Sequence, residues 1–407
     1  MSDKFPLVEL NVIVNVIDSL HKTPNYSEQG YPMVRVTDIK GGYLNLHNTL
    51  KVSKSVFEEF SKKHLPKQGD IVMSRVGTYG VVSYVNTSNK FCLGQNTIVI
   101  NPTECDNKFL FYALQAPIVK EQIEAQAGGS TQKTISLKSI RALKIPNPSF
   151  EKQRKIGELL GDIDDQIFIN SSINKTLEEM AKVLYKHWFV DFGPFQDDEF
   201  VESDLGLIPN EWEVRKLSDI ANINMGQSPK SEFYNSIGEG LPFHQGVKDF
   251  GPRFPQHITF SSKILKVAEA GDILFSVRAP VGRINIAPSK MVIGRGLATL
   301  SSLNNTNSFL LYTLKYIFKE ENSHGSGTIF NSINKTELAN IKIVVPPKNI
   351  MLQFEKIVCE WDNLYQLNSI TNLKLQEARE YLLPRLISGE IEVKEAAKIT
   401  KEVLTNG

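Results

Sequence analysis

Short runs of β-branched and aromatic residues, separated by glycine and proline, fill two stretches of the chain, 1–148 and 209–347. Runs such as YPMVRVTDI, GDIVMSRV and NTIVI have the composition and length of strands bounded by turns. Each stretch also holds one segment with the apolar spacing of a helix, at 107–125 and at 307–320. The pattern predicts two compact α+β domains.

The two stretches are similar to each other in sequence. GDIVMSRVGTYG begins at Gly69, and GDILFSVRAPVG begins at Gly271. Downstream, LGQNTIVI matches IGRGLATL and FLFYAL matches FLLYTL, in the same order and at nearly constant separation. Ordered matches of this kind indicate an internal duplication. The repeated Gly-Asp step is typical of a turn that starts a strand, so we assign it a structural role.

A long segment with apolar residues at alternating spacings of three and four follows each copy. The spacing predicts two helices, over 149–188 and 348–384, with Pro384 ending the second. A seam sustained over several heptads is typical of a coiled coil. The expected seam positions are Ile156, Leu159, Ile163, Ile173, Leu177, Met180 and Leu184 in the first helix, and Phe354, Ile357, Trp361, Leu364, Leu375, Ala378 and Leu382 in the second.

Asn170 and Asn368 occupy corresponding positions in the two seams. A buried asparagine weakens a seam but fixes its register, because other registers leave its amide unpaired. We therefore expect an antiparallel coiled coil with pseudo-two-fold symmetry joining two similar globular domains. The expected pairs are Asn170 with Thr371, Ile173 with Asn368, Leu159 with Leu382, and Leu184 with Ile357. Residues 189–208 are predicted to form an acidic linker, and 385–407 a charged, mobile tail.

The composition is that of an ordinary globular protein of two or three domains, with 407 residues, 41% hydrophobic, 22% charged and a net charge of +1. No apolar run is long enough to span a bilayer, and the N-terminus lacks the pattern of a secretory signal. Cys92, Cys105 and Cys359 lack metal-type spacing. We expect them to be buried free thiols in a reducing cytoplasm, with no membrane association.

Several enzyme classes are disfavoured because their motifs are missing. The sequence contains no GxxxxGK[ST], no HExxH, no CxxC and no GxSxG, and no GxGxxG opens a strand–helix unit. Asn101-Pro102 is followed by threonine, so the Asn-Pro-Pro-aromatic motif of amino methyltransferases is absent as well. We therefore expect a chain without catalysis, metal or cofactor of its own.

Two related domains held apart by stiff helices suit a ligand with a repeating surface. Double-stranded DNA presents equivalent major-groove faces every ~34–36 Å, so a rigid spacer would fix the distance between two half-sites. Arginine reads guanine edges, Asn and Gln read adenine edges, and Lys, Ser and Thr bind phosphates. The candidate DNA-binding residues are Arg75, Thr78, Tyr79, Gln95, Asn96, Gln132 and Lys133 in the first copy, and Gln245, Lys248, Arg253, Arg278, Arg283, Arg295, Thr328 and Asn331 in the second.

The chain resembles the specificity subunit of type I restriction–modification systems over about residues 1–392. The resemblance rests on GDILFSVRAPVGRINIA with IGRGLATL, on IPNEWEVRKLSDI, on LEEMAKVLYKHWFVDFGPF and on YLLPRLISGEI. The first copy departs from the pattern, because it lacks Arg-Ala-Pro and no IPxxWE opens it. Different half-site specificities would require such divergence between the copies.

The resemblance implies that each globular copy is a target-recognition domain for one half of a split DNA sequence. It further implies that two modification subunits, which methylate adenine using S-adenosylmethionine, dock on the helices. Motor-nuclease restriction subunits using ATP and Mg²⁺ would join them to cleave unmethylated DNA. An alternative is a coiled-coil scaffold that displays two protein-binding modules, which predicts no steep salt dependence with DNA. A nuclease or methyltransferase that acts by itself is a third, less favoured alternative.

Overall fold

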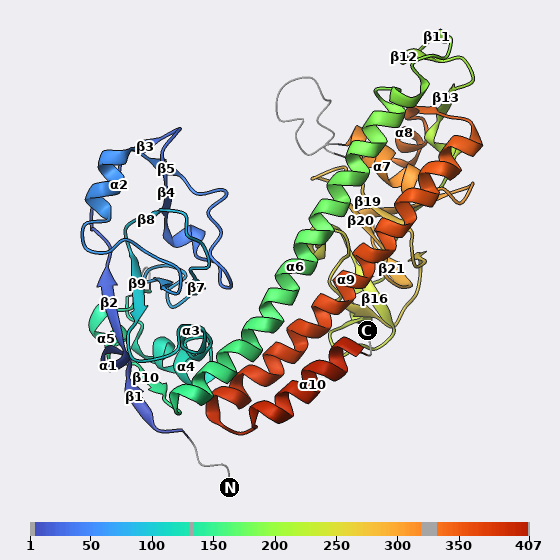
Figure 1. The fold of residues 1–407 in the computed structure, drawn as a ribbon. Coiled ribbons are helices and arrows are strands. Elements are labelled where there is room, and N and C mark those ends of the chain that lie inside the picture. Colours follow the sequence, from blue (N-terminus) through green and yellow to red (C-terminus); the bar gives the residue numbers. More distant parts are fainter. Residues whose placement is uncertain (1–4, 130–132, 319–331, 406–407) are drawn as a thin grey trace. The chain divides into compact units, whose positions relative to one another are not determined.

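The computed structural model describes residues 5–129, 133–318 and 332–405. The chain forms two compact units, unit 1 (Met1–Ser172 with Leu367–Gly407) and unit 2 (Ile173–Gln366). Each unit contains one globular copy together with a part of both long helices, which are labelled α6 and α9 in Figure 1.

The globular part of unit 1 combines two small sheets with short helices. The first sheet is antiparallel, with the order β2 (Val14–Asp18), β9 (Thr97–Pro102), β6 (Ile71–Ser74), β7 (Val82–Tyr84). The second has the order β3 (Tyr26–Ser27), β5 (Lys51–Val52), β4 (Tyr31–Val34), β8 (Cys92–Leu93), and β4 and β8 run parallel. A separate pair joins β1 (Leu7–Glu9) to β10 (Lys144–Pro146). The helices are α1 (Leu10–Ile13), α2 (Lys54–Phe60), α3 (Asn107–Ala113), α4 (Pro117–Gln126) and α5 (Leu137–Arg141).

Unit 2 repeats this topology, which confirms the duplication. Its antiparallel sheet has the order β14 (Ala221–Met225), β22 (Leu297–Ser302), β19 (Ile273–Ser276), β20 (Ile284–Ile286). Its second sheet has the order β15 (Tyr234–Asn235), β17 (Phe260–Ser261), β16 (Leu241–His244), β21 (Met291–Ile293), β18 (Val267–Ala268), and β16 and β21 run parallel. The remaining elements are the pair β13 (Glu213–Lys216) with β23 (Lys342–Val345), the helices α7 (Asn307–Ile317) and α8 (Lys335–Ala339), and the hairpin β11 (Phe200–Ser203) with β12 (Gly206–Pro209) within the expected acidic linker.

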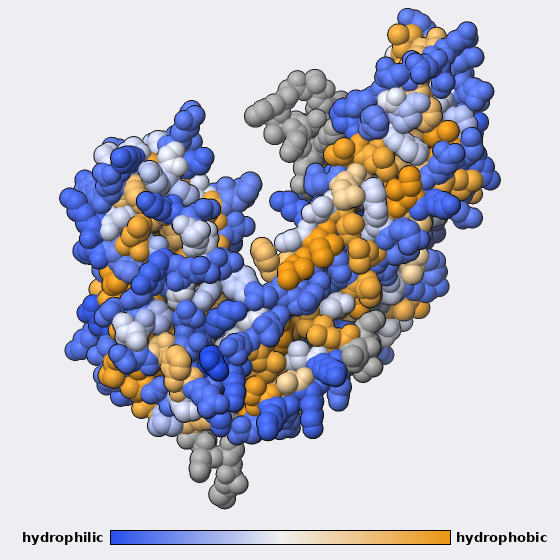
Figure 2. Space-filling model, viewed as in Figure 1, coloured by the Kyte–Doolittle hydropathy of each residue, from blue (hydrophilic) through white to orange (hydrophobic). Residues whose placement is uncertain are grey.

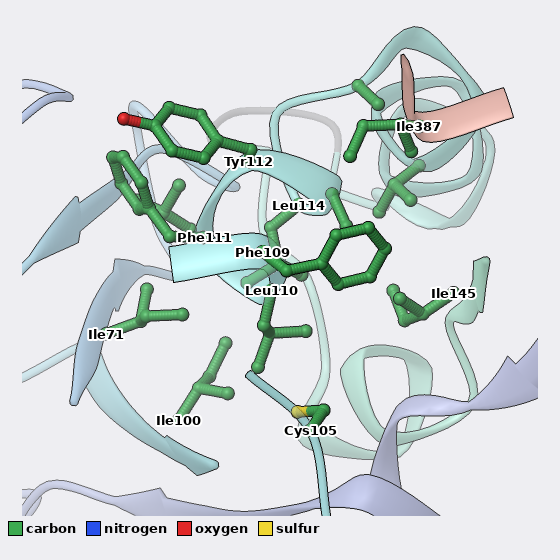
Figure 3. Close-up of a cluster of buried hydrophobic side chains, with 14 of the residues drawn as sticks. Ile71, Ile100, Cys105, Phe109, Leu110, Phe111, Tyr112, Leu114, Ile145 and Ile387 are labelled. Carbon is green, nitrogen blue, oxygen red and sulfur yellow. The ribbon is translucent and has the colours of Figure 1, made fainter. Parts of the chain in front are cut away.

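The core of unit 1 lies between its antiparallel sheet and α3. Phe109, Leu110 and Phe111 of α3 are at most 1% exposed and belong to one buried cluster with Ile71 of β6 and Ile100 of β9 (Figure 3). Burial of each large apolar side chain contributes about 1.5–3 kcal/mol. The corresponding core of unit 2 contains Phe309, Leu310 and Leu311. The similarity of FLFYAL and FLLYTL therefore reflects their equivalent places in the two cores.

The repeated Gly-Asp step forms the expected turn in both units. Gly69 and Gly271 adopt left-handed φ angles of 92° and 86°, which favour glycine. Asp70 accepts a hydrogen bond from the Lys67 amide at 3.0 Å, and Asp272 accepts one from the Glu269 amide at 2.9 Å. The carboxylates close the turns that lead into β6 and β19, which confirms the structural role.

The long helices α6 (Phe150–Phe189) and α9 (Lys348–Ser388) pack antiparallel within each unit. In unit 1, Asp164 of α6 pairs with Arg379 of α9 at 2.7 Å, and Asn170 bonds Asn372 at 2.9 Å. In unit 2, Asn174 bonds the Tyr365 carbonyl at 3.2 Å. The residue numbers of the bonded positions decrease along α9 as they increase along α6, which confirms the antiparallel pairing.

The expected seam is correct in the first part of α6 and wrong in the second. Ile156 and Ile163 are 1% exposed, but Ile173 and Met180 are 39% and 44% exposed. In the second part, the buried side chains are instead those of Asn174, Ala181 and Tyr185. Consecutive steps of four residues (170, 174, 178) shift the packed face, because a straight helix has 3.6 residues per turn and drifts from a strict heptad. In α9, Ile357 and Leu364 are likewise exposed, at 37% and 41%.

Asn170 therefore meets Asn372, one position beyond the expected Thr371. Asn170 also accepts a hydrogen bond from Gln166 at 2.8 Å, and Asn372 donates one to Ser171 at 3.1 Å. Asn368 is 8% exposed at its own seam position. Ile173, which was expected on the seam, is exposed, and Asn174 is buried in its place. That the asparagines fix the register remains a prediction.

Asn170→Ala is expected to destabilise unit 1 by about 1–3 kcal/mol, because it removes two hydrogen bonds, to the half-buried Gln166 and Asn372, each worth about 0.5–1.5 kcal/mol. Asn170→Leu combined with Asn372→Leu removes both members of the interhelical pair, so it should cost less than the single variant, with only the half-buried Gln166 losing its acceptor. Native-state hydrogen exchange of unit 1 peptides measures both effects, with the exposed Glu158→Ala as the control. Equal loss in the single and the double variant would contradict this role of the pair.

Three further expectations about the helices are wrong. The segment 107–125 is two helices, because Pro117 begins α4 and cannot continue α3. Pro384 lies inside α9, which ends at Ser388 before Gly389 with a φ of 79°. The described part of the tail, 385–405, is not mobile: α10 (Val393–Thr405) packs Ala396, fully buried, against the core of unit 1.

Cys92 and Cys105 are buried free thiols as expected, and burial raises the pKa of each to about 12. Cys359 is also free but only half-buried, which corrects the expectation for this residue. Among the described residues, no helix has the length and apolar character needed to cross a membrane.

Candidate nucleic-acid interface

Three loops meet at one edge of the antiparallel sheet in each unit. In unit 1, the Arg75 amide donates to the Asn96 carbonyl at 2.9 Å, and the Ile135 amide donates to the Arg75 carbonyl at 3.0 Å. In unit 2, the Val277 amide donates to the Gly296 carbonyl, and the Ile333 amide donates to the Val277 carbonyl, each at 3.0 Å. We call these residues the loop edge: 75–81, 94–96 and 133–135 in unit 1, and 277–283, 294–296 and 332–333 in unit 2.

The second sheet adds one more residue to each loop edge. The Gly94 amide donates to the Val34 carbonyl, and the Gly294 amide donates to the His244 carbonyl, both at 2.8 Å. These bonds place Arg35 and Gln245, which follow β4 and β16, beside the turn. A Cβ atom on Gly294 would lie 2.8 Å from the Gln245 Cα, so this close approach requires glycine.

The loop edge of unit 2 displays exposed basic and amide side chains. The Gly296 amide donates to the Gln245 carbonyl, and the Gly296 carbonyl accepts from the Val277 amide, each at 3.0 Å. These bonds bring together three exposed residues, namely Gln245, Arg278 next to Val277, and Arg295 next to Gly296. Arg278 pairs with Ser332 in an isolated bridge. Arg283 and Lys248 are also exposed, at the end of the first loop and in the turn after Gln245. This surface suits a polyanion with readable polar edges.

The loop edge of unit 1 carries fewer exposed cations. Arg75 is largely buried, and donates to Asp18 at 2.9 Å and to the Ile135 carbonyl at 3.3 Å. The Tyr79 hydroxyl donates to Glu124 at 2.7 Å, and this bond raises the pKa of the phenol. Thr78 and Lys133 are exposed, and Gln95 and Asn96 are half-buried on the turn. The side-chain hydrogen bonds of Arg75 and Tyr79 therefore stabilise the loop edge of unit 1, on which both residues lie.

Arg35 was not predicted from the sequence. Its guanidinium makes two bonds to Asp38, at 3.0 and 3.2 Å, and the Asp38 hydrogen bond raises its pKa. An alignment of YPMVRVTD with LPFHQGVKD would have placed it opposite Gln245. Gln132, Thr328 and Asn331 lie outside the described residues.

Arg253 does not lie on the loop edge, which corrects its assignment as a DNA-binding residue. It is 3% exposed and lies over the Tyr365 ring, with its Cζ 4.7 Å from the centroid. It donates to Glu178 of α6 at 3.3 Å and to Asp362 of α9. Lys315 of α7 also bonds Glu178, and burial lowers the pKa of this lysine against the opposing effect of that carboxylate. Arg253 therefore anchors the globular part of unit 2 to both helices.

Unit 1 has an anchor built on equivalent residues. The Tyr112 hydroxyl of α3 donates to Asp164 of α6 at 2.7 Å, and burial raises the pKa of this phenol, so it remains a donor. In unit 2, the Tyr312 hydroxyl of α7 approaches Asp362 of α9 at 3.5 Å. A tyrosine and an aspartate thus join each globular part to a long helix, but the cation is Arg379 from α9 in unit 1 and Arg253 in unit 2.

These features define a duplicated α+β protein in which each copy presents a polar loop edge and is anchored to an antiparallel helix pair. Among the described residues, no group of three or more His, Cys, Asp or Glu side chains could hold a metal ion.

Comparisons with known proteins agree with this class. Residues 9–179 and 209–380 both match the family described as the type I restriction modification DNA specificity domain. The chain therefore belongs to the family of type I restriction–modification specificity subunits and contains the family's DNA specificity domain twice.

Individual relatives cover most of the chain. It is 34% identical, over 95% of its length and 93% of the relative, to a protein of Methanocaldococcus jannaschii named as the specificity subunit of a type I restriction enzyme, MjaX. It is 26% identical, over 80% and 87%, to the HindI specificity subunit of Haemophilus influenzae. The crystal structure of the type I S subunit from M. genitalium has a TM-score of 0.64 at 18% identity, over 95% of this chain and 97% of that chain. This last likeness concerns the fold.

Proposed function

We propose that this chain is the DNA-recognition subunit of a type I restriction–modification complex and reads a bipartite target, one half-site per unit. The observation that carries the proposal is the loop edge, which is built twice on the same hydrogen-bond frame but with different side chains. Equivalent frames can bind two equivalent groove faces, whereas different side chains select different sequences.

The helices α6 and α9 serve as the spacer and as the scaffold for partner subunits. Large apolar side chains are exposed on them: in unit 1, Phe168 and Leu373 are each 55% exposed, and in unit 2, Val183 is 67% exposed. Figure 2 shows apolar side chains at the surface of the long helices. Exposed apolar patches of this kind are typical of protein–protein interfaces. The occupants are the adenine methyltransferase and restriction subunits.

The chain contributes recognition and no chemistry. S-adenosylmethionine, ATP and Mg²⁺ are supplied on the partner subunits, in keeping with the missing catalytic motifs in the sequence.

Co-expression with an adenine methyltransferase subunit, followed by mapping of methylated adenines, tests the proposal. We expect one bipartite motif with a fixed gap from the pair, and no methylation from either chain alone. Binding of the full chain to a duplex carrying that motif should weaken steeply between low and moderate salt. Methylation by this chain alone, or DNA binding that is insensitive to salt, would contradict the proposal.

A further inference from the structure

Gln95 and Arg295 occupy one equivalent position in the two units. Both are the second residue of a turn that leads into the central strand of the antiparallel sheet, β9 in unit 1 and β22 in unit 2. The turn is held in each unit by a bond from the preceding glycine amide to β4 or β16, at 2.8 Å in both. The carbonyl of the next residue, Asn96 or Gly296, accepts a hydrogen bond from the amide of the residue that follows β6 or β19. The two side chains therefore leave the same backbone frame.

Glycines flank this position and let the neighbouring loop pack closely against it in unit 2. A Cβ atom on Gly294 would lie 2.8 Å from the Gln245 Cα, and one on Gly296 would lie 2.5 Å from the Gln245 carbonyl oxygen. Asn96, the counterpart of Gly296, adopts a left-handed φ of 62°. The close packing fixes the backbone from which the side chain between the two glycines leaves.

Small hydroxyl residues lie beside this position in each unit. The Arg295 amide donates to the Ser228 hydroxyl at 3.1 Å, and this hydroxyl donates to the Gln245 side chain at 2.7 Å. In unit 1, the Gln95 side-chain amide lies 3.5 Å from the Thr23 hydroxyl. Ser228 and Thr23 both precede a proline, so the neighbours of the position are equivalent as well.

We infer that this turn is a base-reading position, at which Gln95 selects an adenine in the half-site of unit 1 and Arg295 selects a guanine in the half-site of unit 2. The inference rests on the proposed function. A Gln amide matches the N6 and N7 of adenine, and an Arg guanidinium matches the O6 and N7 of guanine, each by two hydrogen bonds. The neighbouring Arg278 and Arg283 have Val76 and Val81 as counterparts, so they do not form such a pair of readers.

Reciprocal substitutions test the inference. The full chain, and its Gln95→Arg and Arg295→Gln variants, are used to select from a randomised double-stranded DNA library, and the bound sequences are read. We expect Gln95→Arg to change one base pair of one half-site from A·T to G·C, and Arg295→Gln to make the reverse change in the other half-site. Each variant should bind the original target about tenfold to a hundredfold more weakly.

Arg295→Lys keeps the charge but loses the two-bond geometry, so it should lose the guanine preference and keep the salt dependence. Gln376→Arg and Arg215→Gln are matched controls at exposed positions of α9 and β13, and should select the original motif. Uniformly weaker binding of both reader variants, with no change of motif, would overturn the inference and leave the proposed function standing. If the unmodified chain selects no bipartite motif, the proposed function fails as well.

Discussion

Replacing Arg253 with methionine is expected to lower the free energy of unfolding of unit 2 by about 3–5 kcal/mol. The guanidinium is 3% exposed and compensates the carboxylates of Glu178 and Asp362. Methionine fills similar space but leaves the Asp362 carboxylate without its arginine, and leaves Glu178 with only the lysines Lys315 and Lys182 beside it among the described residues. Removing one partner of a buried ion pair costs more than the pair contributes when it is intact.

Tryptophan fluorescence isolates this effect. All three tryptophans, Trp188, Trp212 and Trp361, lie in unit 2, so a denaturant titration followed by their emission reports that unit. Arg215→Met, at an exposed position of β13, is the matched control and should change the midpoint little. A midpoint for Arg253→Met equal to that of the control would show that the anchor does not stabilise unit 2. Adding Asp362→Asn to Arg253→Met should restore part of the loss.

Replacing both Arg278 and Arg283 with glutamine is expected to weaken DNA binding on the order of a hundredfold at low salt, because hydrogen bonds from charged groups to phosphates are lost. The slope of log K against log salt should fall by about 2, since each lost phosphate contact removes about 0.9 from it. The loss should be uniform across sequences, because phosphate contacts carry no base preference.

The matched control removes the same charge elsewhere. Arg154 of α6 and Arg215 of β13 are exposed arginines away from the loop edge, and changing both to glutamine should leave the slope nearly unchanged. Binding to a duplex carrying the mapped motif is measured for both double variants over a range of salt. Equal slopes in the two double variants would show that the loop edge of unit 2 does not contact phosphates.

Local sequence signals were sufficient for the repeated features of the fold. The Gly-Asp turns at Gly69 and Gly271 follow from the rarity of left-handed φ angles in other residues, and the existence of the long helices α6 and α9 follows from apolar spacing. The seam beyond Asn170 was mispredicted, because a strict heptad was assumed where the helix packs Asn174 and Ala181. Only the packing partner decides which of two adjacent faces is buried.

The errors at the candidate site have a similar origin. Arg253 has the residue type of a DNA reader, but its burial depends on Glu178 and Asp362, which are far away in the sequence. In the tail, Val393, Ala396 and Ile399 have helical spacing, but the surrounding charges favoured a mobile segment. Residue type and charge predicted exposure in both cases, whereas packing against residues distant in the sequence buries Arg253 and Ala396.

Inserting one heptad into each long helix tests the central claim most directly, namely that two fixed readers are separated by a helical spacer. The insertions fall between Ser172 and Ile173 in α6, and between Gln366 and Leu367 in α9, where the two units divide. Each adds about 10.5 Å of helix, which corresponds to about 3 base pairs at 3.4 Å each. Mapping of methylated adenines should give the same two half-sites with a gap wider by about 3 base pairs. Altered half-site sequences, or an unchanged gap, would contradict the account.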